Sequence, residues 1–155
     1  EVERLMKKFR FSLETVLDYK QQALEALMAE HGAILAQVRD QEAVVAGLEQ
    51  EHLQVDEEFS RRKLEGLSIL DALNYEQYLR ALEREIMEER RKLELLRRKE
   101  EAKRNQVVEA RKETATIEKL KEHKLEDYRK AEQKDEEQRI EEFVSTTRAM
   151  AAVGT

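Results

Sequence analysis

The side chains with the widest chemical repertoire in this 155-residue chain are its three histidines, His31, His52 and His123. Imidazole can bind a metal ion or transfer a proton near neutral pH. A helical zinc motif needs two histidines four residues apart with a glutamate beside the first, and no such spacing occurs here. The chain also lacks cysteine, so it has no thiol nucleophile. We therefore expect no metal site and no thiol chemistry.

The glycines and carboxylates do not form a catalytic pattern either. Phosphate-binding loops need clustered glycines, whereas Gly32, Gly47, Gly66 and Gly154 are scattered. Acidic residues are plentiful, but a catalytic carboxylate needs burial or a close charge to shift its pKa, and a solvated helix provides neither. A two-helix hairpin also offers no deep pocket. The sequence predicts no enzymatic activity, no cofactor and no small-molecule substrate.

The composition restricts the elements that could position these side chains. Charged residues make up 41% of the chain, against about a quarter in typical globular domains. Chain reversals are built mainly from Gly, Pro, Asn and Asp, and this chain has four Gly and no Pro. Rossmann folds, TIM barrels, β-sandwiches and disulfide-stapled scaffolds are thereby excluded. The prediction is an all-α fold with few, very long helices.

The charge pattern argues against nucleic-acid binding and membrane insertion. The net charge is −6, and the basic cluster from Arg90 to Lys99 is interleaved with glutamates, as on a solvated helix face. No apolar run approaches the ~20 residues that a membrane span needs. Lys7 and Lys8 are not followed by an apolar signal-peptide segment, and Met6 could be the biological start. We expect a cytoplasmic protein.

Two heptad frames predict the long helices. In the first, a positions recur from Leu17 to Phe59 and d positions from Leu13 to Val55; most of them are apolar. Ser12 is a suitable N-cap. In the second frame, a positions run from Leu79 to Tyr128 and d positions from Tyr75 to Ala131. A sustained heptad period is typical of a coiled coil. We expect a single coiled-coil domain over residues 1–155, with helices at about 13–60 and 75–145.

Between these frames, residues 61–74 form the predicted connection. Gly66 is the least costly place for a reversal, Ser68 with Asp71 could cap one turn, and Asn74 could cap the second helix. Residues 146–155 are predicted to form a flexible tail. One reversal between two long helices predicts a long antiparallel two-helix coiled-coil hairpin.

The register of that hairpin predicts which polar residues meet. With the reversal near residue 67, His31 should face Glu100 and Lys103, His52 should lie near Glu83, and Gln41 near Glu94. A polar layer avoids the ~1–3 kcal/mol cost of an unpaired buried group. At 1.5 Å per residue the helices are about 70 and about 105 Å long. The second should therefore have a C-terminal helical overhang, from near Glu122 to Phe143.

Three groups of apolar side chains exceed what the heptads require. Phe9, Phe11 and Val16 precede or open the first helix; a local hydrophobic staple is the alternative interpretation. Tyr75 and Tyr78 follow the connection, and Phe59 and Tyr78 should lie close together; ordinary packing is the alternative there. On the overhang, Ile140, Phe143 and Val144 form an apolar stripe suited to docking.

Three blocks resemble the FliJ family of flagellar type III export proteins: MKKFRFSLETVLDYKQ at 6–21, NYEQYLRALEREI at 74–86 and IEEF at 140–143. The resemblance spans nearly the whole chain in order. It implies an antiparallel coiled coil similar to the central stalk of rotary ATP synthases. It also implies binding to the hexameric export ATPase FliI, to the export gate protein FlhA and to export chaperones, in the cytoplasm at the membrane-associated flagellar base.

The resemblance further implies two sets of contact residues. The gate contact would comprise His52, Val55, Phe59, Tyr78 and Leu82. The contact with the ATPase ring would comprise Phe9, Phe11, Leu13, Val16 and Leu17, with Ile140, Phe143 and Val144 opposite. Two alternatives remain: a self-assembling structural coiled coil, in which the overhang pairs with a second copy, and the equivalent stalk of a virulence-type secretion system.

Overall fold

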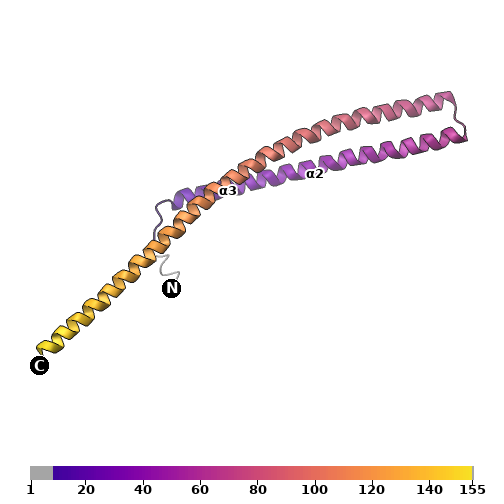
Figure 1. Ribbon diagram of the computed structural model, residues 1–155. Helices are drawn as coiled ribbons and strands as arrows, with labels where there is room; N and C mark the ends of the chain where they lie inside the picture. The colour runs from indigo at the N-terminus through magenta and orange to yellow at the C-terminus, as the bar shows by residue number, and fades with distance from the viewer. Residues whose placement is uncertain (1–8, 155) are drawn as a thin grey trace. The chain divides into compact units, whose positions relative to one another are not determined.

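The computed structural model describes residues 9–154 of the chain. It contains two long helices, α2 (Glu14–Glu65) and α3 (Ile69–Val153), joined by residues 66–68 (Figure 1). The predicted all-α helical hairpin is confirmed. The expectations about Met6, Lys7 and Lys8 concern residues outside the described part.

The contacts between the helices fall into two units. Unit 2 consists of Glu25–Glu109 and includes the connection between α2 and α3. Unit 1 contains the described residues up to Leu24 together with those from Ala110 onward. Each unit therefore pairs one segment of α2 with one segment of α3.

The buried side chains follow the heptads. Every side chain that is buried within the described part lies at a predicted a or d position, where a coiled coil places its seam. Unit 1 contributes Leu17 and Thr114; unit 2 contributes Val45, Phe59, Leu79, Leu82, Ile86, Leu93 and Val107. The Thr114 hydroxyl donates to the Ala110 carbonyl oxygen at 2.8 Å. Its polar group is therefore satisfied despite burial.

The connection is shorter than the predicted 61–74. Gly66 adopts a φ of +103°, in the left-handed region that side chains disfavour. The Ser68 hydroxyl oxygen accepts from the Asp71 amide at 3.1 Å, and the Ala72 amide donates to the Ser68 carbonyl oxygen at 3.0 Å. Ser68 is thus the N-cap of α3, which continues from there as one helix. The prediction of a second cap at Asn74 is wrong, because Asn74 lies inside a helix that has already begun.

The outer helix boundaries also differ from the predicted ones. The Leu17 amide donates to the Leu13 carbonyl oxygen at 2.8 Å, so Leu13 rather than Ser12 occupies the capping position of α2. At the other end, α3 continues through most of the predicted flexible tail to Val153. The alanine-rich end of this segment favours helix, and the Thr146 and Thr147 hydroxyls donate to carbonyl oxygens one turn earlier, at 2.8 Å.

Of the three predicted polar layers in unit 2, the one of His52 with Glu83 is confirmed, and the one of His31 is confirmed for Glu100 but not for Lys103, whose Nζ pairs with Glu30 at 2.8 Å. His31 Nε2 lies 3.0 Å from a Glu100 carboxylate oxygen, and His52 Nε2 lies 3.3 Å from one of Glu83. The third prediction is wrong, since Gln41 bonds to Glu89 instead of Glu94. Glu89 occupies a seam position, whereas Glu94 lies outside the seam and pairs with Arg98 one turn later at 3.3 Å.

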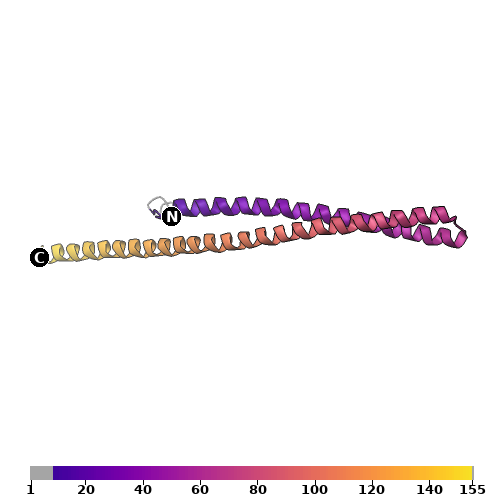
Figure 2. The ribbon, with the colours of Figure 1, turned by 90° about the horizontal axis from the view of Figure 1, so that it is seen from above.

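In unit 1 the overhang begins later than the predicted Glu122. The ring centroids of Phe9 and Tyr128 lie 5.6 Å apart, so the residues before α2 cover one further stretch of α3. From residue 133 to 154 every side chain is exposed. The yellow C-terminal end of α3 in Figure 2 extends past the start of α2 and has no described segment beside it. The overhang, residues 133–154, is thus a stretch of helix whose described side chains are all exposed.

Candidate protein-interaction surfaces

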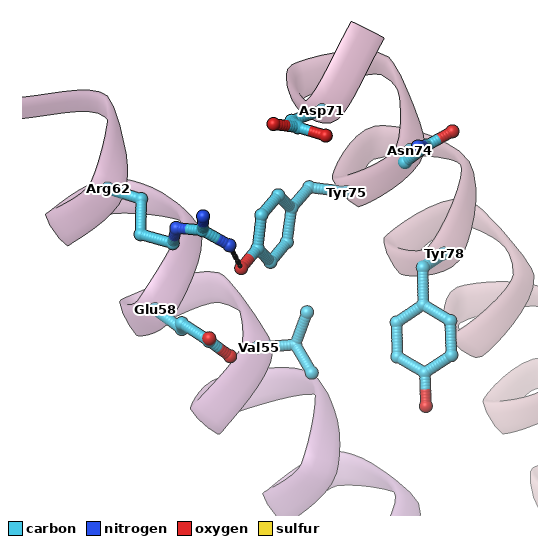
Figure 3. A pocket seen from close by; sticks show the side chains of 7 residues that line it. All are labelled: Val55, Glu58, Arg62, Asp71, Asn74, Tyr75 and Tyr78. Atoms are coloured by element: carbon cyan, nitrogen blue, oxygen red, sulfur yellow. Dashed lines mark hydrogen bonds between the residues drawn. The ribbon is translucent and has the colours of Figure 1, made fainter. Parts of the chain in front are cut away.

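In unit 2 the helices enclose a hollow of about 320 Å³ beside the connection (Figure 3). Its lining comes from both helices: Val55, Glu58 and Arg62 of α2, and Asp71, Asn74, Tyr75 and Tyr78 of α3. Aromatic rings and charged groups of both signs meet in the hollow. This composition is suited to binding a polypeptide rather than to acid–base chemistry.

An aromatic stack forms one wall of this hollow. The Phe59 and Tyr75 rings are stacked with centroids 5.0 Å apart and an interplanar angle of 6°. Arg62 Nη1 donates to the Tyr75 hydroxyl oxygen at 2.9 Å, which raises the pKa of Arg62. Lys63 Nζ lies 3.8 Å from the Phe59 ring centroid, a cation–π contact. Tyr75 therefore takes the place beside Phe59 that the sequence analysis assigned to Tyr78.

Tyr78 is anchored differently. Its hydroxyl donates to the Glu51 carboxylate, and this bond, followed by partial burial, raises the pKa of Tyr78. The side chain remains 45% exposed. In Figure 3 its ring extends along the groove and does not reach across toward Arg62 as the Tyr75 ring does. Tyr78 thus presents an oriented aromatic ring to solvent, as interface residues do.

His52 lies in a second hollow of unit 2, about 310 Å³ in volume, together with Met87 and Arg90. The carboxylate of Glu83 faces His52 and also accepts from Arg80 Nη1 at 2.9 Å. The hydrogen bond from Arg80, and then that from His52, lowers the pKa of Glu83. This network holds the His52 ring in a set orientation at the surface.

The residues predicted for the gate contact therefore divide into two groups. Phe59 and Leu82 are each only 4% exposed and belong to the seam. Tyr78 is exposed, and His52 and Val55 are half-buried. Arg62 and Asp71 also line the hollow, although they were not among the predicted contact residues. The position of Arg62 could have been inferred from the heptad frames, which place Phe59 and Tyr75 in the same seam. Arg62 lies one turn beyond Phe59 on α2 and can therefore reach the Tyr75 hydroxyl.

A second candidate surface lies in unit 1. Phe9, Arg10 and Phe11 line a hollow of about 440 Å³ together with Glu14 and Lys121. Lys121 Nζ lies 2.8 Å from a Glu14 carboxylate oxygen, and Lys20 Nζ lies 2.8 Å from one of Glu113. The Glu113 contact raises the pKa of Lys20. These ion pairs hold the start of α2 against α3.

The predicted ring-contact residues are not brought together by the fold. Leu17 is buried, Phe9 and Phe11 are half-buried, and Leu13 and Val16 are exposed. Phe9 packs on Tyr128, and burial raises the pKa of that tyrosine. Ile140, Phe143 and Val144 lie farther along α3, on the overhang, and are exposed. The expectation that they lie opposite Phe9 is wrong, because the N-terminal segment reaches only the stretch around Tyr128.

Within residues 9–154, no group of three or more His, Asp or Glu side chains is arranged to hold a metal ion. Neither α2 nor α3 has a stretch that is apolar enough over a sufficient length to cross a lipid bilayer.

Comparison with known proteins gives one match. The model of a protein family described as "Flagellar FliJ protein" matches residues 9–150. No curated protein and no solved structure matches the chain.

Proposed function

Because this match covers nearly the whole chain, the protein belongs to the flagellar FliJ family and is a component related to flagellar export, and on that premise we propose that it is a non-catalytic adaptor between the export ATPase ring and the export gate. The flagellar family favours this role over that of a virulence-type stalk. The proposed location is the cytoplasm at the flagellar base. Export chaperones are further proposed partners.

The observation that carries the proposal is the placement of apolar side chains that the seam does not use. In unit 1 the overhang exposes Ile140 and Phe143, the latter at 72%. In unit 2 the hollow beside the connection exposes Tyr78. Exposed apolar side chains at defined places are typical of protein-binding surfaces. Two such surfaces on different units support two different partners.

We assign the ring contact to unit 1. An unpartnered helix with an apolar stripe can dock in a groove, and Phe143 and Ile140 lie one turn apart on such a helix. Phe9, Phe11, Leu13 and Val16 would form a separate part of the ring contact at the start of α2, and the buried Leu17 would support that part from the seam. The ion pair between Glu14 and Lys121 would keep this segment in place while the overhang binds.

We assign the gate contact to unit 2. Tyr78 would supply the central aromatic ring, and Val55 and His52 would contribute the half-buried flanks. Phe59 and Leu82 would hold the contact residues in position without touching the partner, because both are packed in the seam. The hydrogen bond from Tyr78 to Glu51 restricts the ring before the partner arrives, which lowers the entropic cost of binding.

The proposal is tested by separating the two contacts. Tyr78→Ala should weaken binding to the cytoplasmic domain of the gate protein at least about tenfold, and leave stimulation of the ATPase unchanged. Phe143→Ala should weaken ring binding and spare gate binding. Tyr78→Phe is the matched control, since it keeps the ring and removes only the hydroxyl. Equal loss of both activities in either alanine variant would refute the assignment of separate surfaces.

Self-association is the second candidate function. It is favoured by the spacing of Ile140, Phe143, Thr147 and Met150 on the overhang, which alternates between three and four residues as in a coiled-coil seam. Sedimentation velocity over a concentration series separates the candidates. The adaptor should remain monomeric with a high frictional ratio, whereas a structural coiled coil should form a tight dimer that Phe143→Ala dissociates.

A further inference from the structure

The outward face of α3 in unit 2 carries an arginine stripe, which comprises Arg80, Arg84, Arg91 and Arg98. Arg84, Arg91 and Arg98 recur every seven residues, or two helical turns, which is about 10.5 Å. They lie on the side of α3 opposite the buried Leu79, Ile86 and Leu93. The heptad period does not explain why these residues are arginines, because any hydrophilic side chain would serve at an outward position.

The charge of this face is opposite to that of the chain. Between Arg80 and Ala102, the outward positions hold four arginines and three acids, Glu88, Glu94 and Glu101, although the chain has a net charge of −6. Glu94 lies at its edge, where it pairs with Arg98 at 3.3 Å. The face therefore has a net positive charge on an acidic protein.

The arginines of this helix have two kinds of surroundings. Arg90 and Arg97, which flank the seam, reach across to α2 and pair with Glu49 at 2.6 Å and Glu42 at 3.5 Å. Arg84 and Arg91 point outward, and neither makes a hydrogen bond or an ion pair within residues 9–154. The first pair is used to hold the two helices together. The second pair is available to a partner.

Apolar side chains lie between the arginines. Met87 is 56% exposed and Leu95 is 60% exposed. A shallow hollow of about 420 Å³ is lined by Leu95, Leu96, Arg98, Lys99 and Ala102. An exposed leucine beside a hollow with a cationic rim is a feature that a solvated helix face does not require.

We propose that the arginine stripe, with Met87 and Leu95, is a docking surface for an acidic amphipathic helix of a partner protein. The partner's carboxylates would pair with Arg84, Arg91 and Arg98 in the bidentate geometry that guanidinium groups favour, and its apolar residues would cover Leu95 and Met87. A duplex nucleic acid fits less well, because Glu88 and Glu94 lie among the arginines and an apolar strip separates them. Met87 also lines the hollow that contains His52, so this surface adjoins the gate contact there; Arg84, Arg91, Arg98 and Leu95 belong to neither surface assigned above.

The test uses the full chain and a fluorescein-labelled synthetic helix about three heptads long, with glutamate at every seventh position and leucines on the adjoining turn. Fluorescence anisotropy should show saturable binding with a Kd on the order of tens of micromolar. The triple variant R84E/R91E/R98E should weaken binding at least about tenfold. R84A/R91A/R98A should weaken it in the same direction, without adding negative charge.

Two controls separate docking from simple charge attraction. K134E/R139E/R148E makes the same charge change on the overhang and should leave the Kd within about twofold of wild type. M87S/L95S changes no charge and should still weaken binding by about fivefold. Circular dichroism confirms that each variant stays helical.

Three results would overturn the proposal. The first is equal binding of a peptide with the same composition in scrambled order. The second is equal loss of affinity in both charge-reversal triples. The third is tighter binding of a short DNA duplex or of anionic phosphatidylglycerol vesicles than of the acidic helix, which would give this face to a different class of partner.

Discussion

The side-chain amide of Gln41 on α2 donates a hydrogen bond to the backbone carbonyl oxygen of Glu89 on α3 at 3.0 Å, and it also contacts the Glu89 carboxylate. One residue thus binds both the backbone and the side chain of its partner across the seam. Backbone carbonyls inside a helix are already engaged in helical bonds, so this contact uses the second lone pair. It sets the stagger of the two helices at this layer of unit 2.

Replacing Gln41 by alanine should destabilise unit 2 by about 1 kcal/mol, the usual net contribution of an intramolecular hydrogen bond. The change removes the donor and leaves the Glu89 acceptors half-buried. Urea unfolding followed by far-UV circular dichroism measures the effect. Gln50→Ala is the matched control, because Gln50 is exposed on the same helix. If both variants lose the same stability, the Gln41 contact has no special role.

Stability should fall in acid, in part through Glu89. The hydrogen bond from Gln41, followed by that from Lys92, lowers the pKa of Glu89 below its ordinary value of 4.5. A carboxylate with a depressed folded-state pKa stabilises the protein above the ordinary pKa, and this stabilisation is lost as the pH falls through the folded value. Glu89→Gln should therefore lower the Tm at about pH 7 and have a smaller effect at about pH 3.

The control for that measurement is Glu88→Gln, which removes a neighbouring carboxylate from the exposed face of α3. Its Tm difference from wild type should be small at both pH values. A Glu89→Gln variant that loses as much stability in acid as wild type would show that other carboxylates account for the pH dependence.

The three glycines within α2 and the connection should respond to alanine in opposite directions. Gly66→Ala should destabilise the hairpin by about 1–2 kcal/mol, because its φ of +103° is unfavourable for a residue with a Cβ. Gly32→Ala and Gly47→Ala should each stabilise α2 by about 0.5–1 kcal/mol. At all three positions an added Cβ would meet nothing within 4 Å, so backbone conformation alone decides the sign. Chemical denaturation of the three variants checks it.

Removing the overhang after Glu132 should leave the unfolding temperature within about 2 °C of wild type. Every side chain from 133 to 154 is exposed, so the deletion removes no buried contact. Under the proposed function, the same truncation should abolish ATPase stimulation and preserve gate binding. Thermal melts and ATPase assays measure the two effects. A large drop in Tm would show that the overhang folds back onto the rest of the protein in solution.

Replacing Phe59 by alanine should cost about 3–5 kcal/mol, as for other buried aromatic residues. The ring is 4% exposed and stacks on Tyr75, so its loss opens a cavity beside the connection. Tyr75→Phe should cost at most about 1 kcal/mol, since it removes only the hydroxyl that accepts from Arg62. Denaturation midpoints of the two variants separate the ring contribution from that of the hydroxyl. Similar losses would contradict the proposed dominance of stacking.

Several features were predictable from the amino-acid order because they depend on neighbours along the chain. The heptad period placed Leu17, Val45 and Ile86 in the seam, and all three are buried. Gly66 was identified as the reversal because the chain has so few turn-forming residues. The matched family blocks pointed to the flagellar FliJ family, to which the chain belongs.

The helical class, the seam positions and the reversal at Gly66 follow from residue order alone, since each depends on local periodicity and turn chemistry. Three contacts become apparent only when the helices are packed together: Gln41 with Glu89, Tyr75 rather than Tyr78 stacked on Phe59, and Phe9 on Tyr128. The physical reason is that a heptad specifies which face of one helix is apolar but not how far two helices slide past each other. That stagger depends on the length of the connection and on the fit of side chains from both helices at once.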